Sequence, residues 1–590
     1  MITIDVETSS EHDINTPEYV QTAKIKWCGI QDLKTGEYFL LPHSEKERAK
    51  ELIKTRGDVI ITFNGEAFDL PILKNNGYLL GNQFTSIDVM VVLKKHNSIM
   101  KRKLLRFNMK SVAKTLLNLD KGEIDYHIFE KDDWTPEEIM LIREYLKQDI
   151  YITGELFKYC DEELSPLKSF LSDYDQKKLK YLTLSPASYT YSVICNELGI
   201  KKEFEDGVVH KKYKGGKVIE PTGEKFIGKI KCLDFGSAYP HMYMMGNLFS
   251  NKCYCCNESE KWCANEFFPK LQGKYCSKTL GKIELIVKKF YELRQEFKKK
   301  NDPRQYALKV ILNVFYGTTA NPVFKKLYNR VTASDCTYMV RTCILYAKEV
   351  FESNGYTFIY GDTDSNFLLD PFNDEERLLK VKDEIISYIK SFVPLQQDTF
   401  DMGIDARIKA MFFIKSGDRN LMKNYLYITE DNELVVKGLR IVKSNASKLS
   451  KLIFKKYLTP KILESLDIKF NPLDVRKWVL EELQNDYTVA GFDMKVNNPK
   501  SYKMVGQLER QVSLKYGVGV HFMIPTNSFG VGKGLKICTL EDFKDHNLGV
   551  KNINLRHVYK ELEPFLSSGS VMMQIKRGKK VFQNSLEMWV

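Results

Sequence analysis

The chain has 590 residues, 43% of them hydrophobic, and its 89 Lys and Arg residues outnumber 76 Asp and Glu residues, which gives a formal net charge of +13. A single hydrophobic core stops growing near ~250–300 residues, so several domains are expected, and the basic excess suits a polyanionic partner without requiring one. No stretch approaches the ~20 apolar residues of a membrane span, the opening MITIDVETSS has acids where a signal peptide is apolar, and the 12 cysteines are scattered; we therefore expect no membrane association and a cytoplasmic rather than secreted protein.

The first 155 or so residues are predicted to form an α/β domain. MITIDVET alternates apolar and polar residues as a strand does, and DVIITFNG (58–65) and SIDVMVVL (86–93) read as further strands. Helical spacing follows over residues 137–160. Strands that alternate with helices are typical of an α/β fold.

Acidic residues recur in this region at positions that suit a metal site. Asp5 and Glu7 lie two apart on a strand, so both side chains leave the same face, and Asp69 follows Asn64 in TFNGEAFD. Tyr145 and Asp149 lie four apart on one helical face. Taken singly, each acid is more often a cap, a turn residue or a surface charge. Together, four carboxylates need Mg²⁺ or Mn²⁺ to offset their repulsion, which is the requirement of a two-metal nuclease, with Tyr145 orienting the water.

Further along the chain the expected elements are a mostly helical stretch, a strand at 229–235, helices at 280–300 and 304–316 joined by a tight turn, and a strand–turn–strand at 356–369. From residue 445 onward the signals weaken.

Three motifs between residues 229 and 369 resemble those of family B DNA polymerases. They are KCLDFGSAYP with Asp234, Ser237, Tyr239 and Pro240, ALKVILNVFYG with Lys309, Asn313, Tyr316 and Gly317, and FIYGDTDS with Asp362 and Asp364. A lone DxD at a hairpin tip is more often a solvated turn, but the order of all three motifs argues against that. The N-terminal acids resemble the three motifs of DnaQ-like 3′-to-5′ proofreading exonucleases.

The resemblance implies two Mg²⁺ or Mn²⁺ ions in each of two active sites. Asp234, Asp362 and Asp364 would hold the polymerase pair, and Asp5, Glu7, Asp69 and Asp149 the exonuclease pair. By resemblance the incoming dNTP is contacted by Arg294, Lys298, Lys309, Asn313, Ser237, Tyr316 and Tyr239. Lys309 would neutralise or protonate pyrophosphate, and Tyr239 would exclude a 2′-hydroxyl.

Primer-template DNA is the implied partner. The residues implied to contact it are Asn64, Tyr213, Gly215, Gly216, Lys423, Tyr425 and Lys437. VVKGLRIVKSN departs from the family pattern at Ser444 and Asn445, where Arg-Asp is usual. A GG pair alone is usually a turn. The basic stretch 574–580 could track duplex phosphates.

The expected architecture is α/β and α+β multidomain: an RNase H-like (DnaQ-like) exonuclease followed by a right-hand palm, fingers and thumb. We expect the exonuclease at 1–157, a linker and first part of the palm at 158–264, the fingers hairpin at 265–316, the second part of the palm at 317–444, and the thumb with a C-terminal tail at 445–590. The short spacings and early exonuclease acids favour a compact viral or phage-like enzyme, acting as a monomeric catalytic subunit.

Two features stay open. Cys253, Cys255, Cys256, Cys263 and Cys276 are irregularly spaced, which favours reduced or partly buried thiols over zinc. The ending Gln583–Val590 fits a sliding-clamp-binding tail and plain thumb structure equally. Rival functions are a nuclease with a defunct polymerase half, a noncatalytic nucleic-acid scaffold, and a reverse-transcriptase-like palm, which would leave the exonuclease motifs unexplained.

Overall fold

The computed structural model describes residues 1–12, 17–79, 81, 84–100, 102, 104, 106–205, 213–250, 255–416, 419–443, 445–496, 519–526 and 536–567. The chain forms two compact units, each built from separate stretches of sequence. The first comprises Met1–Lys214, Tyr239–Tyr338 and Val393–Gln397, and the second Gly215–Ala238, Met339–Phe392 and Asp398–Val590. No helix within the described ranges is long and apolar enough to cross a bilayer.

The first unit begins with a five-stranded sheet of order β3-β2-β1-β4-β5. Its strands are β1 Ile2–Ser9, β2 Lys24–Asp32, β3 Tyr38–Pro42, β4 Val59–Thr62 and β5 Thr85–Asp88. β1 pairs antiparallel with β2 and parallel with β4, which in turn runs parallel to β5. The parallel pairs place the ends of β1, β4 and β5 at one edge of the sheet, so the acids at these ends are brought near one another.

The strand predicted at 86–93 is only partly present. It ends at Asp88, whose side chain accepts a hydrogen bond from the amide of Val91 at 3.2 Å and so caps helix α4, Val89–His96. The prediction was wrong beyond Asp88 because a run of valines packs equally well as a strand or as the buried face of a helix.

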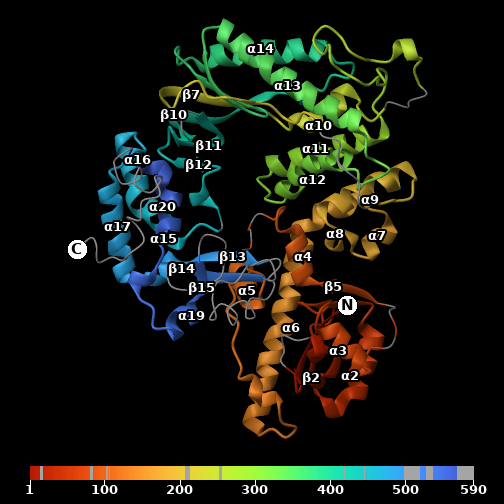
Figure 1. Ribbon diagram of the computed structural model, residues 1–590. Coiled ribbons are helices and arrows are strands. Elements are labelled where there is room, and N and C mark those ends of the chain that lie inside the picture. Colours follow the sequence, from red (N-terminus) through yellow and green to blue (C-terminus); the bar gives the residue numbers. More distant parts are fainter. Residues whose placement is uncertain are drawn as a thin grey trace. The chain divides into compact units, whose positions relative to one another are not determined.

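Helices cover the sheet and continue into a helical region. Those before residue 200 are α1 Pro17–Thr22, α2 Lys46–Arg56, α3 Asp69–Asn75, α4, α5 Met109–Leu116, α6 Pro136–Leu164, α7 Asp173–Lys177, α8 Lys180–Thr183 and α9 Pro186–Leu198. The longest, α6, starts at a capping box in which Thr135 and Glu138 bond each other's backbone amides. It packs on β1, β2 and β4, and is the long orange helix in Figure 1.

The helix pair predicted at 280–300 and 304–316 is present as α11 Lys282–Lys299 and α12 Gln305–Ala320. The two pack against each other and against α9. One hydrophobic core joins side chains from the sheet, α4 and α6 to Phe290 of α11 and Phe315 of α12. The α11–α12 pair and the N-terminal region therefore share a core within this unit.

The second unit contains a seven-stranded antiparallel sheet of order β12-β11-β10-β7-β9-β8-β6. Its strands are β6 Val218–Ile219, β7 Lys225–Phe235, β8 Thr357–Asp362, β9 Ser365–Leu369, β10 Met402–Ser416, β11 Arg419–Thr429 and β12 Leu434–Lys437. β7 confirms the strand predicted at 229–235, and β8 and β9 confirm the strand–turn–strand predicted at 356–369. In Figure 1, α14 (Glu375–Ser391) and the last turns of α13 (Arg330–Ser353) lie on one side of this sheet.

The remainder of the second unit is a mixed region whose sequence signals were weak. Its elements are α15 Lys448–Ile453, α16 Thr459–Ser465, α17 Pro472–Asn485, β13 Phe492–Val496, β14 Gly519–Thr526, β15 Lys536–Thr539, α19 Leu540–Asp545 and α20 Arg556–Leu562. Most are shorter than ten residues, too short for a clear periodicity, yet they share one buried apolar core. Cys253, Ser444, the basic stretch 574–580 and the tail 583–590 lie outside the described residues.

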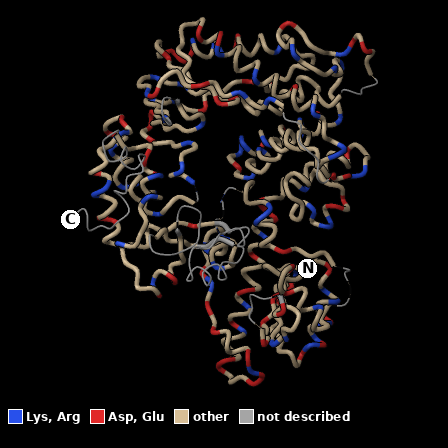
Figure 2. The backbone as a smooth tube through the Cα atoms, viewed as in Figure 1, with Lys and Arg blue, Asp and Glu red and all other residues tan. Residues whose placement is uncertain are grey.

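Charge is mixed along both units. Figure 2 shows Lys and Arg interspersed with Asp and Glu along the described backbone of each unit. The net charge of +13 is therefore a small difference between many charges of both signs, and individual contacts decide where each site is basic or acidic.

Candidate active sites

The structure gathers the N-terminal carboxylates at the end of β1 in the first unit. Asp5 and Glu7 project from β1, and Asp149 projects from α6, which packs on that strand. One oxygen from each of these three side chains lies within 4.8 Å of the others. Asp69, at the start of α3, accepts a hydrogen bond from the amide of Val6 at 3.2 Å, which places it beside the same strand. We call these four residues the N-terminal acidic site.

Burial and mutual repulsion make this site electrostatically unstable without positive charge. Burial is the main cause that raises the pKa of Asp5 well above its ordinary value, and Asp69, Asp149 and Glu7 raise it further. Burial likewise raises the pKa of Glu7 to about 8, and that of Asp69 to about 7. Burial also raises the pKa of Asp149, against the lowering effect of Lys121. Such carboxylates bind a cation or retain protons.

Lys121 and Tyr126 join this site, although neither stood out in the sequence. The Lys121 ammonium donates to the Tyr145 hydroxyl at 2.8 Å and lies 2.6 Å from Oδ1 of Asp149. The Tyr126 and Tyr145 hydroxyls lie 2.9 Å apart. Burial is the main cause that raises the pKa of Tyr145, so its hydroxyl keeps its proton at neutral pH. A lysine and a tyrosine in KGEIDY, just before the predicted helix, were the available signal.

Asn64 and Asp88 have a structural relation. Asn64 adopts a left-handed conformation with φ of 66° after β4, and its amide donates to Oδ1 of Asp88 at 3.0 Å. Asp88 also accepts from the amides of Glu66 and Val91. Asp88 thus fixes the turn that carries Asn64.

The carboxylates of the second unit lie at the ends of adjacent strands. Asp234 is near the end of β7 and opposite Ser365 of β9, and Asp362 ends β8, also opposite Ser365. The Ser365 hydroxyl donates to Oδ2 of Asp234 at 2.6 Å. The carbonyl of Asp364 accepts from the amide of Phe235 at 3.0 Å, which ties the hairpin to β7. We call Asp234, Asp362 and Asp364 the strand-end acids.

The strand-end acids are less tightly gathered than the N-terminal acidic site. Within the described ranges, the acidic group that brings three ligand oxygens within 4.8 Å is Asp5, Glu7 and Asp149. The Lys423 ammonium lies 2.8 Å from Oδ1 of Asp362 and supplies positive charge there. The strand register thus brings the strand-end acids near one another, and the Lys423 ammonium lies beside Asp362.

Lys423, Tyr425 and Lys437 lie on the strands beside these acids. The amide of Lys423 donates to the Tyr360 hydroxyl at 3.1 Å, and its φ is 63°. Tyr425 is buried in an aromatic core and pairs with Lys437 across β11 and β12. Burial, followed by the charge of Asp362, raises the pKa of Tyr425, so its hydroxyl keeps its proton at neutral pH, and its ring packs among other aromatics.

The residues expected to contact a triphosphate occupy the helix pair of the first unit. Arg294 and Lys298 are one turn apart on α11, and Lys309 and Asn313 are one turn apart on α12. Lys298, Lys309 and Asn313 are exposed, whereas Arg294 is half-buried and donates to Gln305 at 3.4 Å. Burial lowers the pKa of Arg294, but an arginine remains charged.

Three tyrosines in the first unit form one cluster. The hydroxyls of Tyr213 and Tyr316 lie 2.6 Å apart, and the rings of Tyr239 and Tyr316 are 4.9 Å apart. Tyr239 lies on α10, Ala238–Gly246, and Tyr316 on α12. Ser237, which precedes α10, has a φ of 53° and belongs to the second unit. The structure thus joins Tyr213 to the two predicted nucleotide-contacting tyrosines.

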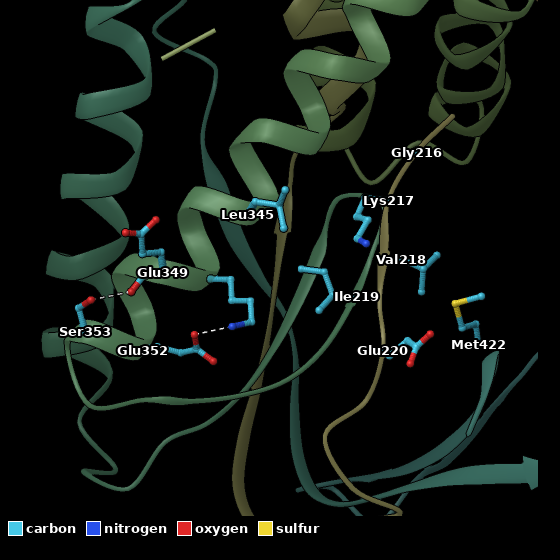
Figure 3. Close-up of a pocket in the computed structure, with 11 residues that line it drawn as sticks. Gly216, Lys217, Val218, Ile219, Glu220, Leu345, Glu349, Glu352, Ser353 and Met422 are labelled. Carbon is cyan, nitrogen blue, oxygen red and sulfur yellow. Dashed lines mark hydrogen bonds and ion pairs between the residues drawn. The ribbon is translucent and has the colours of Figure 1, made fainter. Parts of the chain in front are cut away.

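The glycine pair lies in the second unit beside a pocket. A Cβ added to Gly215 would meet no heavy atom within 4 Å, so the packing of the chain itself does not require glycine there. Gly216, Lys217, Ile219, Leu345 and Met422 are among the residues lining a pocket of about 1010 Å³ between β6 and α13 (Figure 3). The pocket contains none of the strand-end acids.

The donor sets fit divalent cations with a preference for oxygen. Mg²⁺ and Mn²⁺ are bound by carboxylates, and the crowded N-terminal acidic site has more negative charge than Lys121 alone can offset. The strand-end acids offer the same oxygen donors from β7 and the β8–β9 hairpin. Both sets therefore offer the oxygen ligands that hard cations prefer. The N-terminal acidic site fits such an ion more closely, because its three ligand oxygens lie within 4.8 Å of one another.

The cysteines at 255–276 behave differently from the other cysteines of the chain. Cys255, Cys256 and Cys276 lie together, with sulfur–sulfur distances of 2.9, 3.4 and 3.8 Å. Cys263 is exposed and contacts the carbonyl of Ala264. Cysteines elsewhere, such as Cys28 and Cys343, are buried, and burial raises their pKa.

Comparison with known proteins places these sites in context. Residues 165–513 match the model of DNA polymerase family B, and residues 19–165 match that of the RNase H superfamily. DNA polymerase 1 of Aeropyrum pernix is 25% identical over 580 residues, covering 85% of this chain and 56% of that protein. The DNA polymerase of Thermococcus gorgonarius is 25% identical over 458 residues, covering 69% of this chain and 56% of its own. The chain thus spans about half the length of the curated relatives it matches.

Solved structures show the same fold. The family B DNA polymerase from Pyrobaculum calidifontis matches with a TM-score of 0.56 and 16% identity, over 97% of this chain and 78% of that one. An RNase H-like region followed by this larger region is the architecture expected from the sequence.

Proposed function

Since the chain belongs to DNA polymerase family B, we propose that it is a DNA-directed DNA polymerase with a 3′-to-5′ proofreading exonuclease, and that it acts in DNA replication. The observation that carries the proposal is the presence of two separate carboxylate sets, one at the end of β1 and one at the ends of β7, β8 and β9. Primer-template DNA and dNTPs are its proposed substrates.

At the N-terminal acidic site we assign cleavage of the 3′-terminal phosphodiester. Asp5, Glu7 and Asp149, with Asp69 beside them, would hold divalent cations, and the Tyr145 hydroxyl would orient the attacking water. Lys121 holds Tyr145 and Asp149 in place through its two contacts. Because Glu7, Asp149 and Tyr145 are buried, the geometry of these three side chains is set by packing rather than by solvent.

At the strand-end acids we assign nucleotide addition. Asp234, Asp362 and Asp364 would hold the cations of this second site. Divalent cations, once bound at either site, activate the nucleophile and stabilise the charge on the leaving oxygen. Ser365 fixes the carboxylate of Asp234 through its hydrogen bond, which keeps one ligand oriented before substrate arrives.

Nucleotide contacts are assigned to the helix pair and the tyrosine cluster. Lys298, Lys309 and Asn313 project into solvent from α11 and α12, where a polyphosphate can reach them, and Arg294 would add a bidentate contact. Lys309 would protonate the departing pyrophosphate. Tyr239, packed on Tyr316, would lie under the sugar and exclude a 2′-hydroxyl, and Ser237 would contact the triphosphate.

Contacts with the DNA strand are assigned to residues around both sites. Asn64, on its left-handed turn, would hold the 3′ terminus in the exonuclease, and Lys423, Tyr425 and Lys437 would hold the primer. The open space at Gly215, together with Gly216 and Tyr213, would let a phosphate strand approach the backbone. The expected boundaries, with exonuclease at 1–157 and fingers at 265–316, remain part of the proposal.

A protein partner is also proposed, at the C-terminal tail. The tail Gln583–Val590 is assigned as a contact for a processivity clamp, on its sequence pattern alone. The enzyme is proposed to act as a single catalytic subunit.

The test is separation of the two activities on a labelled primer-template with Mg²⁺, with and without dNTPs. Asp362→Asn should lower extension by roughly 100- to 1000-fold or more, the loss typical when a charge-stabilising group is removed, while 3′ shortening persists. The double variant Asp5→Asn with Glu7→Gln should do the reverse. Glu66→Gln, an exposed acid near the exonuclease site, is the matched control and should leave both unchanged. Loss of both activities in either site variant would contradict the two-site assignment.

A further inference from the structure

Two adjacent cysteines, Cys255 and Cys256, lie close to a third, Cys276, in the segment that leads into α11. The sulfur of Cys276 lies 2.9 Å from that of Cys255 and 3.4 Å from that of Cys256, and the latter two are 3.8 Å apart. A tetrahedral thiolate site with metal–sulfur bonds near ~2.3 Å separates its sulfurs by about 3.8 Å. A disulfide needs about 2.05 Å and uses only two sulfurs. The triangle is therefore closer overall to a three-thiolate site.

The backbone on the Cys276 side is fixed by buried contacts. Tyr275 pairs with Trp262 through two backbone hydrogen bonds of 2.8 Å, and the amide of Cys276 donates to the Ser250 hydroxyl at 2.8 Å. The side chain of Asn247, fully buried, donates to the carbonyls of Cys276 and Thr279. The turn that presents the Cys276 sulfur is thus held in one conformation before any ligand binds.

The Cys255–Cys256 side is anchored to the same turn. The short helix Glu258–Glu260 follows directly, closed by a capping box at Asn257. Ser277 donates to the carbonyl of Glu260 at 2.7 Å, and the Lys278 ammonium lies 3.2 Å from the Glu260 carboxylate. The segment with Cys255 and Cys256 and the segment with Cys276 are therefore joined by hydrogen bonds and an ion pair as well as by their sulfurs. These contacts pre-organise the site.

The Cys276 sulfur has hydrogen-bond donors beside it as well as the two other sulfurs. The backbone amides of Lys278 and Thr279 both donate to this sulfur. Such outer hydrogen bonds orient a metal ligand before the metal binds. Other cysteines of the chain, such as Cys28 and Cys343, are simply buried in the core. Cys276 is thus set apart from packing cysteines by its partners.

We propose that Cys255, Cys256 and Cys276 bind one thiophilic d¹⁰ cation, of which Zn²⁺ is the abundant member. Within the described ranges, these three side chains form the group of close sulfur ligands, and a tetrahedral site takes one ligand more. Cys255 is exposed and gives the ion a path from solvent, while Cys276 is buried. Irregular spacing hid this site from the sequence, because Cys276 is brought beside Cys255 and Cys256 by tertiary contacts such as those of Asn247 and Glu260.

Bound metal would brace the entry to the fingers-like helix pair. Cys276 lies six residues before Lys282, the first residue of α11, and Asn247 also accepts a hydrogen bond from the amide of Gly281. A cation bound by Cys276 and by Cys255 and Cys256 together would hold the residues before α11 more firmly. The inference concerns this segment and does not rest on the proposed polymerase function.

The test is Co²⁺ titration of the full-length protein, purified metal-free under reducing conditions. We expect thiolate-to-cobalt charge-transfer absorption that saturates at one equivalent and is displaced by Zn²⁺. Oxygen-donor sites elsewhere in the chain give no such band, so the readout is specific for sulfur. Cys276→Ser should weaken binding more than about 100-fold, exceeding the loss typical of an outer-sphere change.

Cys263→Ser is the matched control, because Cys263 is an exposed cysteine of the same segment outside the cluster. It should titrate as the unaltered protein does. Cys255→Ser and Cys256→Ser serve if Cys276→Ser fails to fold, and each should also lose the band. Absence of the band in folded protein, its persistence in all three cluster variants, or a Cys255–Cys276 disulfide-linked peptide under reducing purification would overturn the proposal.

Discussion

At the scale of single residues, Lys121 is a positively charged side chain that the protein itself places beside the N-terminal acidic site. It contacts both Tyr145 and Asp149, and its side chain is 12% exposed. Its charge lowers the pKa of Asp149, and its ammonium lies 4.1 Å from the centre of the Tyr145 ring. The residue therefore controls the position of two groups assigned to catalysis.

Lys121→Ala should lower the 3′-to-5′ exonuclease rate by roughly 10- to 100-fold, because small displacements of catalytic groups are costly. Primer extension should be unchanged. The rate is measured on single-stranded labelled DNA with saturating Mg²⁺. Lys114→Ala is the control, since Lys114 pairs with Asp120 at the surface and such pairs contribute little. An exonuclease rate equal to that of the control would remove Lys121 from the site.

His96 should make the first unit less stable at acid pH. It is fully buried on α4 and bonds the carbonyl of Leu182 through Nε2 at 2.9 Å. Burial lowers its pKa from 6.5 to about 4. The unfolded chain binds the proton first, so stability is full above pH 6.5 and falls as the pH drops toward 4, by about 3 kcal/mol.

His96→Gln should flatten this acid limb of the unfolding midpoint between pH 4 and 7, while lowering stability at neutral pH. The midpoint is followed by thermal denaturation in a pH series. His127→Gln is the control, because His127 is exposed and paired with Glu130. An acid limb that is as steep in His96→Gln as in the control would show that another group causes it.

The carboxylates were predictable at this scale because their spacing encodes strands and helix turns. Asp5 with Glu7, and Tyr145 with Asp149, share faces whatever the rest of the chain does. Lys121 was not predictable, since one lysine among many basic residues gains meaning only when a loop brings it onto α6. The same holds for the three cysteines.

At the scale of elements, the turn after β12 depends on a single glycine. Gly438 has a φ of 72°, and a Cβ there would lie 1.8 Å from the carbonyl oxygen of Lys423. Lys423 in turn lies beside Asp362. The close approach of these two backbones holds Lys423 in its unusual left-handed conformation next to a strand-end acid.

Gly438→Ala should destabilise the protein by roughly 2 kcal/mol or more, since the left-handed conformation alone costs about 1–2 kcal/mol and the backbone clash adds to it. Extension activity should fall with it. Stability is measured by denaturant unfolding. Gly549→Ala is the control, because its φ is −121° and nothing lies near its added Cβ. Equal stability of both variants would contradict the strain at Gly438.

Helices and strands with a clear sequence periodicity were predicted. Segments whose sequence suits a helix and a strand equally were not. β7, the β8–β9 hairpin and the α11–α12 pair lie where periodicity and turn residues placed them. The residues after Asp88 form α4 because a side-chain cap, invisible to periodicity, starts a helix there. The short elements between 445 and 567 left no pattern long enough to interpret, although they bury a common core.

At the scale of the whole molecule, the sequence order of motifs does not follow the compact units. The helices that carry Lys309 and Arg294 belong with the N-terminal sheet, and the strand-end acids belong to the other unit. The core that runs from α6 to α12 is formed by side chains more than a hundred residues apart in sequence. Such packing follows from tertiary contacts, which a reading of local patterns does not supply.

The polypeptide passes between its two units at Lys214, Ala238, Tyr338, Phe392 and Gln397. A cut at Lys214 would leave residues 1–214 wholly in the first unit, and a cut at Gln397 would leave residues 398–590 wholly in the second; each other cut would divide both units between the fragments. Residues 1–214 have core partners, Phe290 and Phe315, on the other piece, and β10 of residues 398–590 pairs with β7 on the other piece. The two pieces of a nicked chain would therefore remain held together, and we expect neither proposed activity to be obtained by simple excision.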